Sequence, residues 1–214
     1  MKKKWLKTFL SVVLLLTAWI LVDLNYPYKT DIKNFNASEA ARLDGAMWRS
    51  YYEKKKLKLL WQSAGLMRKQ FAVPFWRSTA MAYHAAKAAF VFKDGKTRSD
   101  YNKALPNLTN YYTHINNISK TPFDAGKAAK LELEWWIIRR YRNEHPPVEW
   151  EKLLAQTAEV MYGVPADKFA GYAKLRVQAM LLRDSKGENI TENDWTEINS
   201  ILQKAWVSFV EALN

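Results

Sequence analysis

The chain has 214 residues, carries a formal net charge of +12, and is 49% hydrophobic. This length and apolar content suffice for one sizeable folded domain and are unlike those of disordered chains. The sequence contains no cysteine, which excludes disulfides, thiolate nucleophiles, Cys-based zinc sites and thioether-linked haem.

The first residues predict a membrane anchor. Lysines occupy positions 2, 3, 4 and 7, and an uncharged, mostly apolar run covers residues 8–22. As a helix this run is about 22 Å long, which by length alone also fits the apolar region of a signal peptide. No small residue that could form a cleavage site lies between Ala18 and Thr30. An uncleaved anchor over residues 1–24 is therefore the better interpretation.

The charge pattern also predicts an orientation in the membrane. Lysines before a single span tend to stay in the cytoplasm, so the protein is expected to be a single-pass membrane protein with its main domain extracytoplasmic. Residues 25–37 are polar, contain Pro27 and read as a linker. Residues 38–214 then form the extracytoplasmic domain.

The domain is basic, with 29 Lys and Arg against 20 Asp and Glu beyond residue 24, a net charge of +9. Such a domain beside a membrane could contact anionic lipid head groups, an anionic polymer or another envelope protein. The alternative is that the charge only keeps the domain soluble. Nucleic acid is not expected as a partner on the outer side, and no RNA-binding aromatic motif is found.

Helical signals follow one another along the domain. With Ser38 as cap, residues 39–69 predict one long helix, with a bend at Gly65. Residues 78–92 are apolar nearly all round, as in a helix buried in the middle of a bundle. Within residues 99–118, Pro106 either kinks a helix or starts a second one.

The later helices have clearer ends. Asp124 predicts the cap of a helix over residues 125–144, which ends at Pro146 and Pro147. Further helices are expected over residues 148–162 and 166–183. Thr191 and Asp194 match a capping signature before a final apolar stripe.

No run alternates apolar and polar residues as a half-buried strand does, so the fold class is all-α. Short connections favour an irregular antiparallel helical bundle of about six to seven helices after the anchor. Stacked helical hairpins of the tetratricopeptide kind are the alternative, although no repeating consensus is found.

The stretch LELEWWIIRR, residues 131–140, places charges among large apolar groups. On a helical projection Trp135, Trp136 and Arg139 fall within about 60° of Glu132. Glu134 points to the other side, so the two glutamates cannot form a carboxylate pair by themselves. Because both faces carry apolar groups, this helix is expected to be central.

The first long helix has a matching stripe, in which Arg42 and Arg49 share a face with Gly45 and Ala46. The small residues permit close approach of another backbone. If this face meets the Glu132 face, the carboxylate lies among Arg42, Arg49 and Arg139.

Two interpretations of these residues are open. One is a buried ion network that serves only the architecture. The other is a pocket for an anionic ligand, with Arg42, Arg49 and Arg139 as donors and Trp135 and Trp136 as walls. In the second case Glu132 is a candidate catalytic residue, since a carboxyl among indoles can have a raised pKa.

His84 lies in the most apolar helix and is a second catalytic candidate, although a lone histidine there is more often a core residue. No Glu precedes a His by three residues, and HExxH, P-loop and GxSxG motifs are absent. The sequence therefore predicts no metal site and no cofactor.

The pattern favours a membrane-anchored extracytoplasmic binding or accessory protein of the cell envelope, more plausibly not an enzyme. An enzyme or small-ligand receptor centred on Glu132 is the alternative. A structural tether whose useful part is the anchor is a third interpretation.

Overall fold

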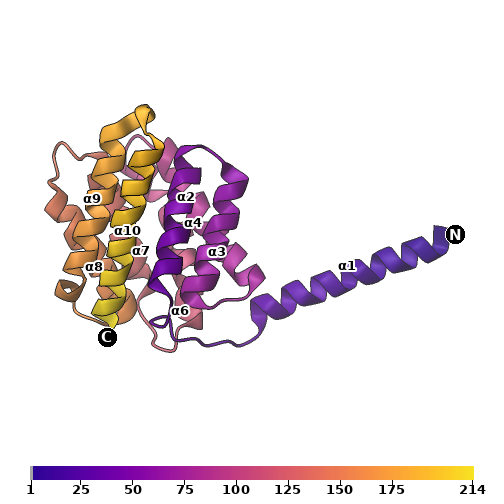
Figure 1. The fold of residues 1–214 in the computed structure, drawn as a ribbon. Helices are drawn as coiled ribbons and strands as arrows, with labels where there is room; N and C mark the ends of the chain where they lie inside the picture. Colours follow the sequence, from indigo (N-terminus) through magenta and orange to yellow (C-terminus); the bar gives the residue numbers. More distant parts are fainter. Residues whose placement is uncertain (1) are drawn as a thin grey trace.

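A computed structural model describes residues 2–214, with side chains from Lys4 onward. The chain is all-α, as predicted, with an apolar N-terminal helix α1 (Lys2–Asn25) that projects from a helical body (Figure 1). The long helices of the body are α2 (Ala37–Tyr52), α3 (Lys56–Phe71), α4 (Phe75–Asp94), α6 (Leu105–Ile118), α7 (Ala125–Arg140), α8 (Pro147–Tyr162), α9 (Ala170–Lys186) and α10 (Glu192–Leu213). Short segments are α5 (Arg98–Asn102), η1 (Ala166–Phe169) and η2 (Gly187–Asn189).

These eight long helices form a closed ring. Each packs against its neighbour in chain order, α2 on α3, α3 on α4, α4 on α6 and onward to α9 on α10. The last helix, α10, then packs back against the first, α2. An open stack of tetratricopeptide-like hairpins has no contact between its first and last helices. The alternative of stacked hairpins is therefore wrong.

The single helix predicted over residues 39–69 is two antiparallel helices. The chain turns at residues 53–55, where Lys54 adopts a left-handed conformation with φ of 59° and Lys55 N donates to Ser50 O at 2.9 Å. The turn contains neither Gly nor Pro, so it has no strong local signal. Gly65, where a bend was expected, lies inside α3. This split explains why the ring has more helices than predicted.

The capping predictions had mixed outcomes. Asp124 caps α7 by accepting from Lys127 N at 2.9 Å, and Thr191 with Asp194 forms the predicted capping box of α10. The predicted cap at Ser38 is wrong, because Asn36 accepts from Glu39 N at 2.8 Å. Pro106 lies in the first turn of α6 and so starts a second helix.

The helices expected to be central are ring members like the others. In α4, Tyr83 is 50% exposed on the outside, while Ala85, Ala86 and Ala89 line the space inside the ring. A ring helix needs apolar residues on both flanks for its neighbours and more on its inner side. This explains why α4 and α7 look buried all round in the sequence.

The segment between α1 and the ring is held against the ring by hydrogen bonds, unlike a free linker. Thr30 N donates to Ile118 O at 2.7 Å, and Lys120 N donates to Thr30 O at 2.9 Å. The Tyr28 hydroxyl donates to Ala72 O at 2.7 Å, and the Ile32 side chain is buried.

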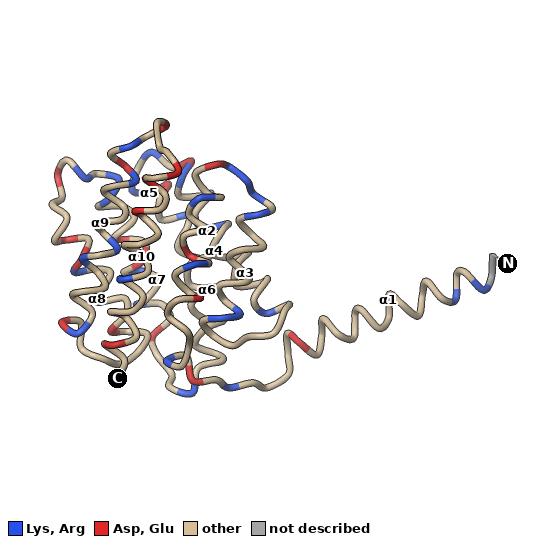
Figure 2. Tube along the Cα trace, in the orientation of Figure 1, with Lys and Arg blue, Asp and Glu red and all other residues tan. Residues whose placement is uncertain are grey.

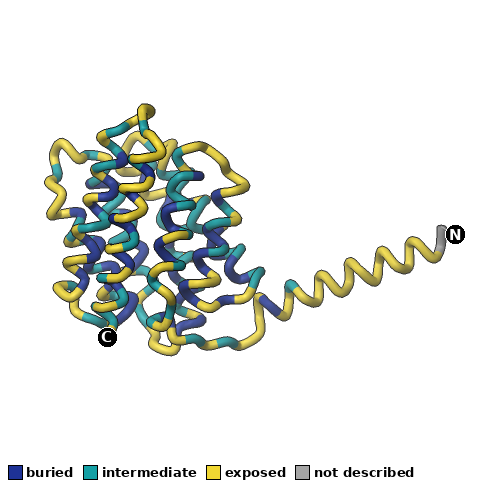
Figure 3. Tube along the Cα trace, viewed as in Figure 1, coloured by how far each residue is buried: buried dark blue, intermediate teal, exposed yellow. Residues whose placement is uncertain are grey.

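Helix α1 is long and apolar enough to cross a bilayer. The apolar span covers the 22 residues Lys4–Asn25, about 33 Å at the helical rise, against about 30 Å for a hydrocarbon core. Figure 3 shows it exposed along nearly its whole length, whereas the ring helices are buried on their inner sides.

Ring closure can be tested at Gly45. A Cβ atom added there would overlap the Asn199 side chain of α10, so Gly45→Leu should push α2 away from α10 and cost about 3 kcal/mol. Arg42→Leu, at an exposed position of the same helix, should stay within about 0.5 kcal/mol of wild type. Chemical denaturation measures the free energy of unfolding of both variants. Equal losses of this free energy would contradict the closed ring.

Candidate functional site

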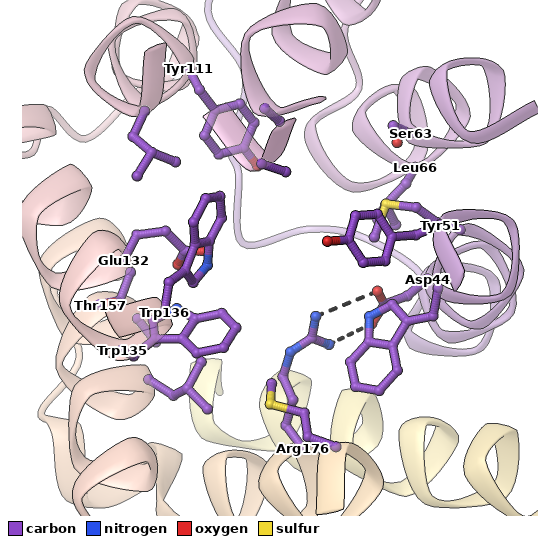
Figure 4. Close-up of a pocket in the computed structure, with 18 of the residues that line it drawn as sticks. Asp44, Tyr51, Ser63, Leu66, Tyr111, Glu132, Trp135, Trp136, Thr157 and Arg176 are labelled. Carbon is purple, nitrogen blue, oxygen red and sulfur yellow. Dashed lines mark hydrogen bonds and ion pairs between the residues drawn. The ribbon is translucent and has the colours of Figure 1, made fainter. Parts of the chain in front are cut away.

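The ring encloses a cavity of about 600 Å³. Aromatic side chains make up much of its wall, and Figure 4 labels four of them, Tyr51, Tyr111, Trp135 and Trp136. Trp48 and Tyr112 also line it. One end is closed by the buried side chains Phe71, Tyr162 and Phe209. At the other end the lining residues Tyr51, Arg140 and Arg142 are exposed, so the cavity opens to the surface there.

Glu132 of α7 lies on the cavity wall beside Trp135 and Trp136 (Figure 4). Its carboxylate accepts hydrogen bonds from the Tyr112 hydroxyl at 3.1 Å and from Trp136 Nε1 at 2.9 Å. Both donors are uncharged, and no Lys or Arg within the described part of the chain forms an ion pair with it. The Trp135 indole also lies against the Glu132 carboxyl and favours its charged form. The groups that donate to this carboxyl are therefore phenol and indole side chains.

Burial raises the pKa of Glu132 above its ordinary value. The surrounding indole and phenol donors and the positive charge of Arg176 oppose that rise without cancelling it. A carboxyl in this setting keeps its proton to a higher pH than one in water. The group can therefore both accept and donate a proton or a hydrogen bond in the cavity.

Arg176 of α9 faces the same cavity (Figure 4) and is held by Asp44 of α2 at 2.5 Å. Asp44 is fully buried and also accepts from Trp206 Nε1 at 2.9 Å. The guanidinium lies over the Trp48 ring, 5.3 Å from its centroid. Burial alone would lower the pKa of Arg176, but the Asp44 carboxylate outweighs burial and raises it, so the guanidinium stays charged.

Arg139 lies nearer the open end and is also paired. Its guanidinium donates to Asp184 at 2.8 and 3.0 Å and to the Tyr52 hydroxyl at 3.2 Å. Arg142 approaches the same carboxylate at 3.8 Å. Arg140 lies over the rings of Phe92 and Tyr101, 5.0 and 5.8 Å from their centroids.

The structure brings together four of the predicted residues. Glu132, Trp135, Trp136 and Arg139 all line the cavity, as their shared helical face predicted. Arg42 and Arg49 do not join them. The stripe that carries Arg42, Gly45 and Arg49 faces α10, where Arg49 donates to Glu192 and Glu53 on the outside of the ring. The two predicted faces do not meet.

His84 also lies outside the cavity. Its ring sits 5.5 Å from that of His114 on α6 and 5.5 Å from that of Tyr83, and it is not among the lining residues. The structure therefore does not bring His84 to Glu132. His114 is half-buried, and burial together with the nearby His84 lowers its pKa.

Sequence reasoning missed Asp44, Arg176 and Asp184. A signal for each was present, because each takes the place of an apolar residue in a stripe. Asp44 is followed at helical spacing by Met47, Trp48 and Tyr51, while Arg176 and Asp184 alternate with Tyr172 and Met180 at intervals of four. A charged residue within such a stripe must find a partner on another helix.

Comparisons with protein-family models, curated proteins and solved structures find no match to this chain. Within the residues that the structure describes, no group of three His, Asp or Glu side chains is arranged to hold a metal ion. The chemistry of the site therefore has to be inferred from the cavity itself.

The pH dependence of stability tests the environment of Glu132. Because folding raises its pKa, the folded state holds the proton more tightly, and the free energy of unfolding must fall as pH rises above the ordinary value of 4.5. Glu132→Gln removes this loss of unfolding free energy, because glutamine does not ionise. The variant should therefore gain stability relative to wild type between pH 4.5 and neutrality. Thermal unfolding over this range measures the gain.

Glu188→Gln, at an exposed position, is the control. The difference in stability between this variant and wild type should not change with pH. If the difference in stability between Glu132→Gln and wild type also did not change with pH, the carboxyl would not be buried without compensation.

Proposed function

We propose that the chain is a membrane-anchored binding protein of the cell envelope whose ring receives a small organic molecule in its central cavity. The observation that carries this proposal is a cavity of about 600 Å³ with aromatic walls and a carboxyl that has no charged partner among the described residues. Cavities of about 300–1,000 Å³ with a few polar groups on apolar walls are the usual form of small-molecule sites.

The charges inside the cavity favour a particular kind of ligand. Arg139 and Arg176 are already paired with Asp184 and Asp44, so neither is free to bind the anion expected from sequence. Glu132 has only neutral donors. A ligand with an ammonium or hydroxyl group could donate to Glu132 while its apolar part packs on Trp135 and Trp136. In this proposal, the chain works by binding, as an accessory protein.

The proposed location follows from the first helix. An uncleaved anchor spanning Lys4–Asn25 would hold the ring at the bilayer. Lysines before the span favour a cytoplasmic N-terminus and an extracytoplasmic ring. A ligand for the cavity would then be met on the outer side of the membrane.

Binding of three matched probes tests the site in the full chain embedded in nanodiscs. Benzylamine is a cation with donors, benzyl alcohol is a neutral donor, and benzoate is an anion of similar size. Saturation-transfer NMR should rank benzylamine first, because it alone brings both donors and positive charge to Glu132. Glu132→Gln should weaken benzylamine binding about tenfold.

The matched control is Glu134→Gln, since Glu134 pairs with Arg98 away from the cavity. It should leave all three affinities unchanged. Preferential binding of benzoate, or no effect of Glu132→Gln on benzylamine, would overturn the proposed ligand chemistry.

A further inference from the structure

The outer side of α3 and α4 carries large exposed apolar residues among lysines. Leu57 is 86% exposed, Trp61 65% and Tyr83 50%. Lys56, Lys58 and Lys87 are exposed beside them. We call these six residues the α3–α4 face. Scattered single apolar residues are normal on a protein surface, but a set of rings and lysines on adjacent helices matches the composition of membrane-interface segments.

This face is continuous with the anchor helix. Trp19 of α1 stacks on Phe75 with ring centroids 6.0 Å apart and meets Trp76 at 5.5 Å. Phe75 in turn contacts the exposed Trp61 at 6.1 Å. Trp19 lies near the outer end of the apolar span, where tryptophans prefer the level of the lipid head groups. The aromatic contacts therefore extend from that level to the α3–α4 face.

The joint between α1 and the ring fixes the direction of the anchor. The Asp23 carboxylate, although in the anchor, accepts from the backbone N–H of Trp76 at 2.9 Å and so caps α4. The Arg77 side chain donates back to the carbonyl oxygens of Asp23 and Tyr26. Asp23 and Arg77 are both buried.

The direction set by this joint turns one side of the ring toward the bilayer. Figure 1 shows α1 leaving on the side of α3 and running across the direction of the ring helices instead of parallel to them. If α1 crosses the bilayer, the ring helices lie along its surface with the α3–α4 face toward it.

The charge of this part of the chain suits an anionic surface. Residues 54–93 contain nine Lys and Arg and no Asp or Glu. Figure 2 shows the lysines that gather at the turn between α2 and α3, next to the α3–α4 face. Each basic group near a membrane surface strengthens binding to anionic lipids.

We infer that the α3–α4 face rests on the outer surface of the bilayer, with Leu57, Trp61 and Tyr83 in the interface and the lysines on anionic lipid phosphates. This inference rests on the proposed anchoring by α1 and goes beyond the cavity. It gives the ring a fixed orientation on the membrane, with α8 on the side away from the lipid, since α8 is opposite α3 in the order of the ring.

The absence of cysteine permits a clean test with single labels in the full chain. Leu57→Cys and Val148→Cys, both at exposed positions and on opposite sides of the ring, are labelled with an environment-sensitive fluorophore and reconstituted into vesicles. Lipids spin-labelled near the head group then report contact by quenching. The label at position 57 should be strongly quenched, and the label at position 148 should not.

Lipid composition tests whether the lysines of the α3–α4 face contact anionic lipid phosphates. Quenching at position 57 should increase when phosphatidylglycerol is added to phosphatidylcholine, and Lys56→Gln with Lys58→Gln should remove the increase. Lys152→Gln with Lys174→Gln, exposed on α8 and α9, should leave it unchanged. No dependence on phosphatidylglycerol would overturn the role of anionic lipid.

Flotation of the labelled protein with the vesicles separates two kinds of failure. Protein that floats with equal quenching at positions 57 and 148, or with none, is anchored but does not rest on the α3–α4 face, and the inference is wrong. Protein that does not float is not anchored, which overturns the proposed anchoring and this inference together.

Discussion

The closed ring depends on one buried carboxylate. Asp44 of α2 accepts from Arg176 of α9 and from Trp206 of α10, which joins the first helix of the ring to the last two. Removing one partner of a buried ion pair typically costs about 3 to 5 kcal/mol, because the other charge is left without compensation. Buried ion pairs are best known for fixing how packed helices align. Here the pair aligns α2 with α9 through two residues, Asp44 and Arg176, that lie 132 positions apart in the chain.

A closed ring of eight long helices leaves space at its centre. Side chains fill only part of that space, and the rest is the cavity. Small alanines of α4 and large rings of α7 both line the cavity, while Arg139 and Arg176 are paired with Asp184 and Asp44. The ion-network interpretation of LELEWWIIRR holds for Arg139, and a ligand pocket at Glu132 stays a proposal. Arg139 belongs to a structural ion network, whereas Glu132 faces open space with neutral donors only. This division supports a binding site whose polar centre is Glu132.

Local signals made the helices and one face of the site predictable. Asp124 and Thr191 cap their helices by short-range hydrogen bonds, and the shared face of Glu132, Trp135 and Trp136 follows from helical geometry alone. Contacts between distant segments could not be predicted in the same way. The turn at Lys54 has no local marker, and Arg49 finds its partner in Glu192, far along the chain. The tie between Asp23 and α4 likewise depends on where the ring places that helix.

The existence of an open cavity inside the ring is the central claim, and two neighbouring alanines of α4 test it directly. Ala89 lines the cavity, while Ala88 is fully buried between helices. The free energy of unfolding should fall by about 1 to 3 kcal/mol for Ala88→Leu, because the added atoms overpack a filled interface. Ala89→Leu should cost little or stabilise the protein, since its side chain enters empty space. Equal losses for the two variants would mean that the centre of the ring is packed and holds no site.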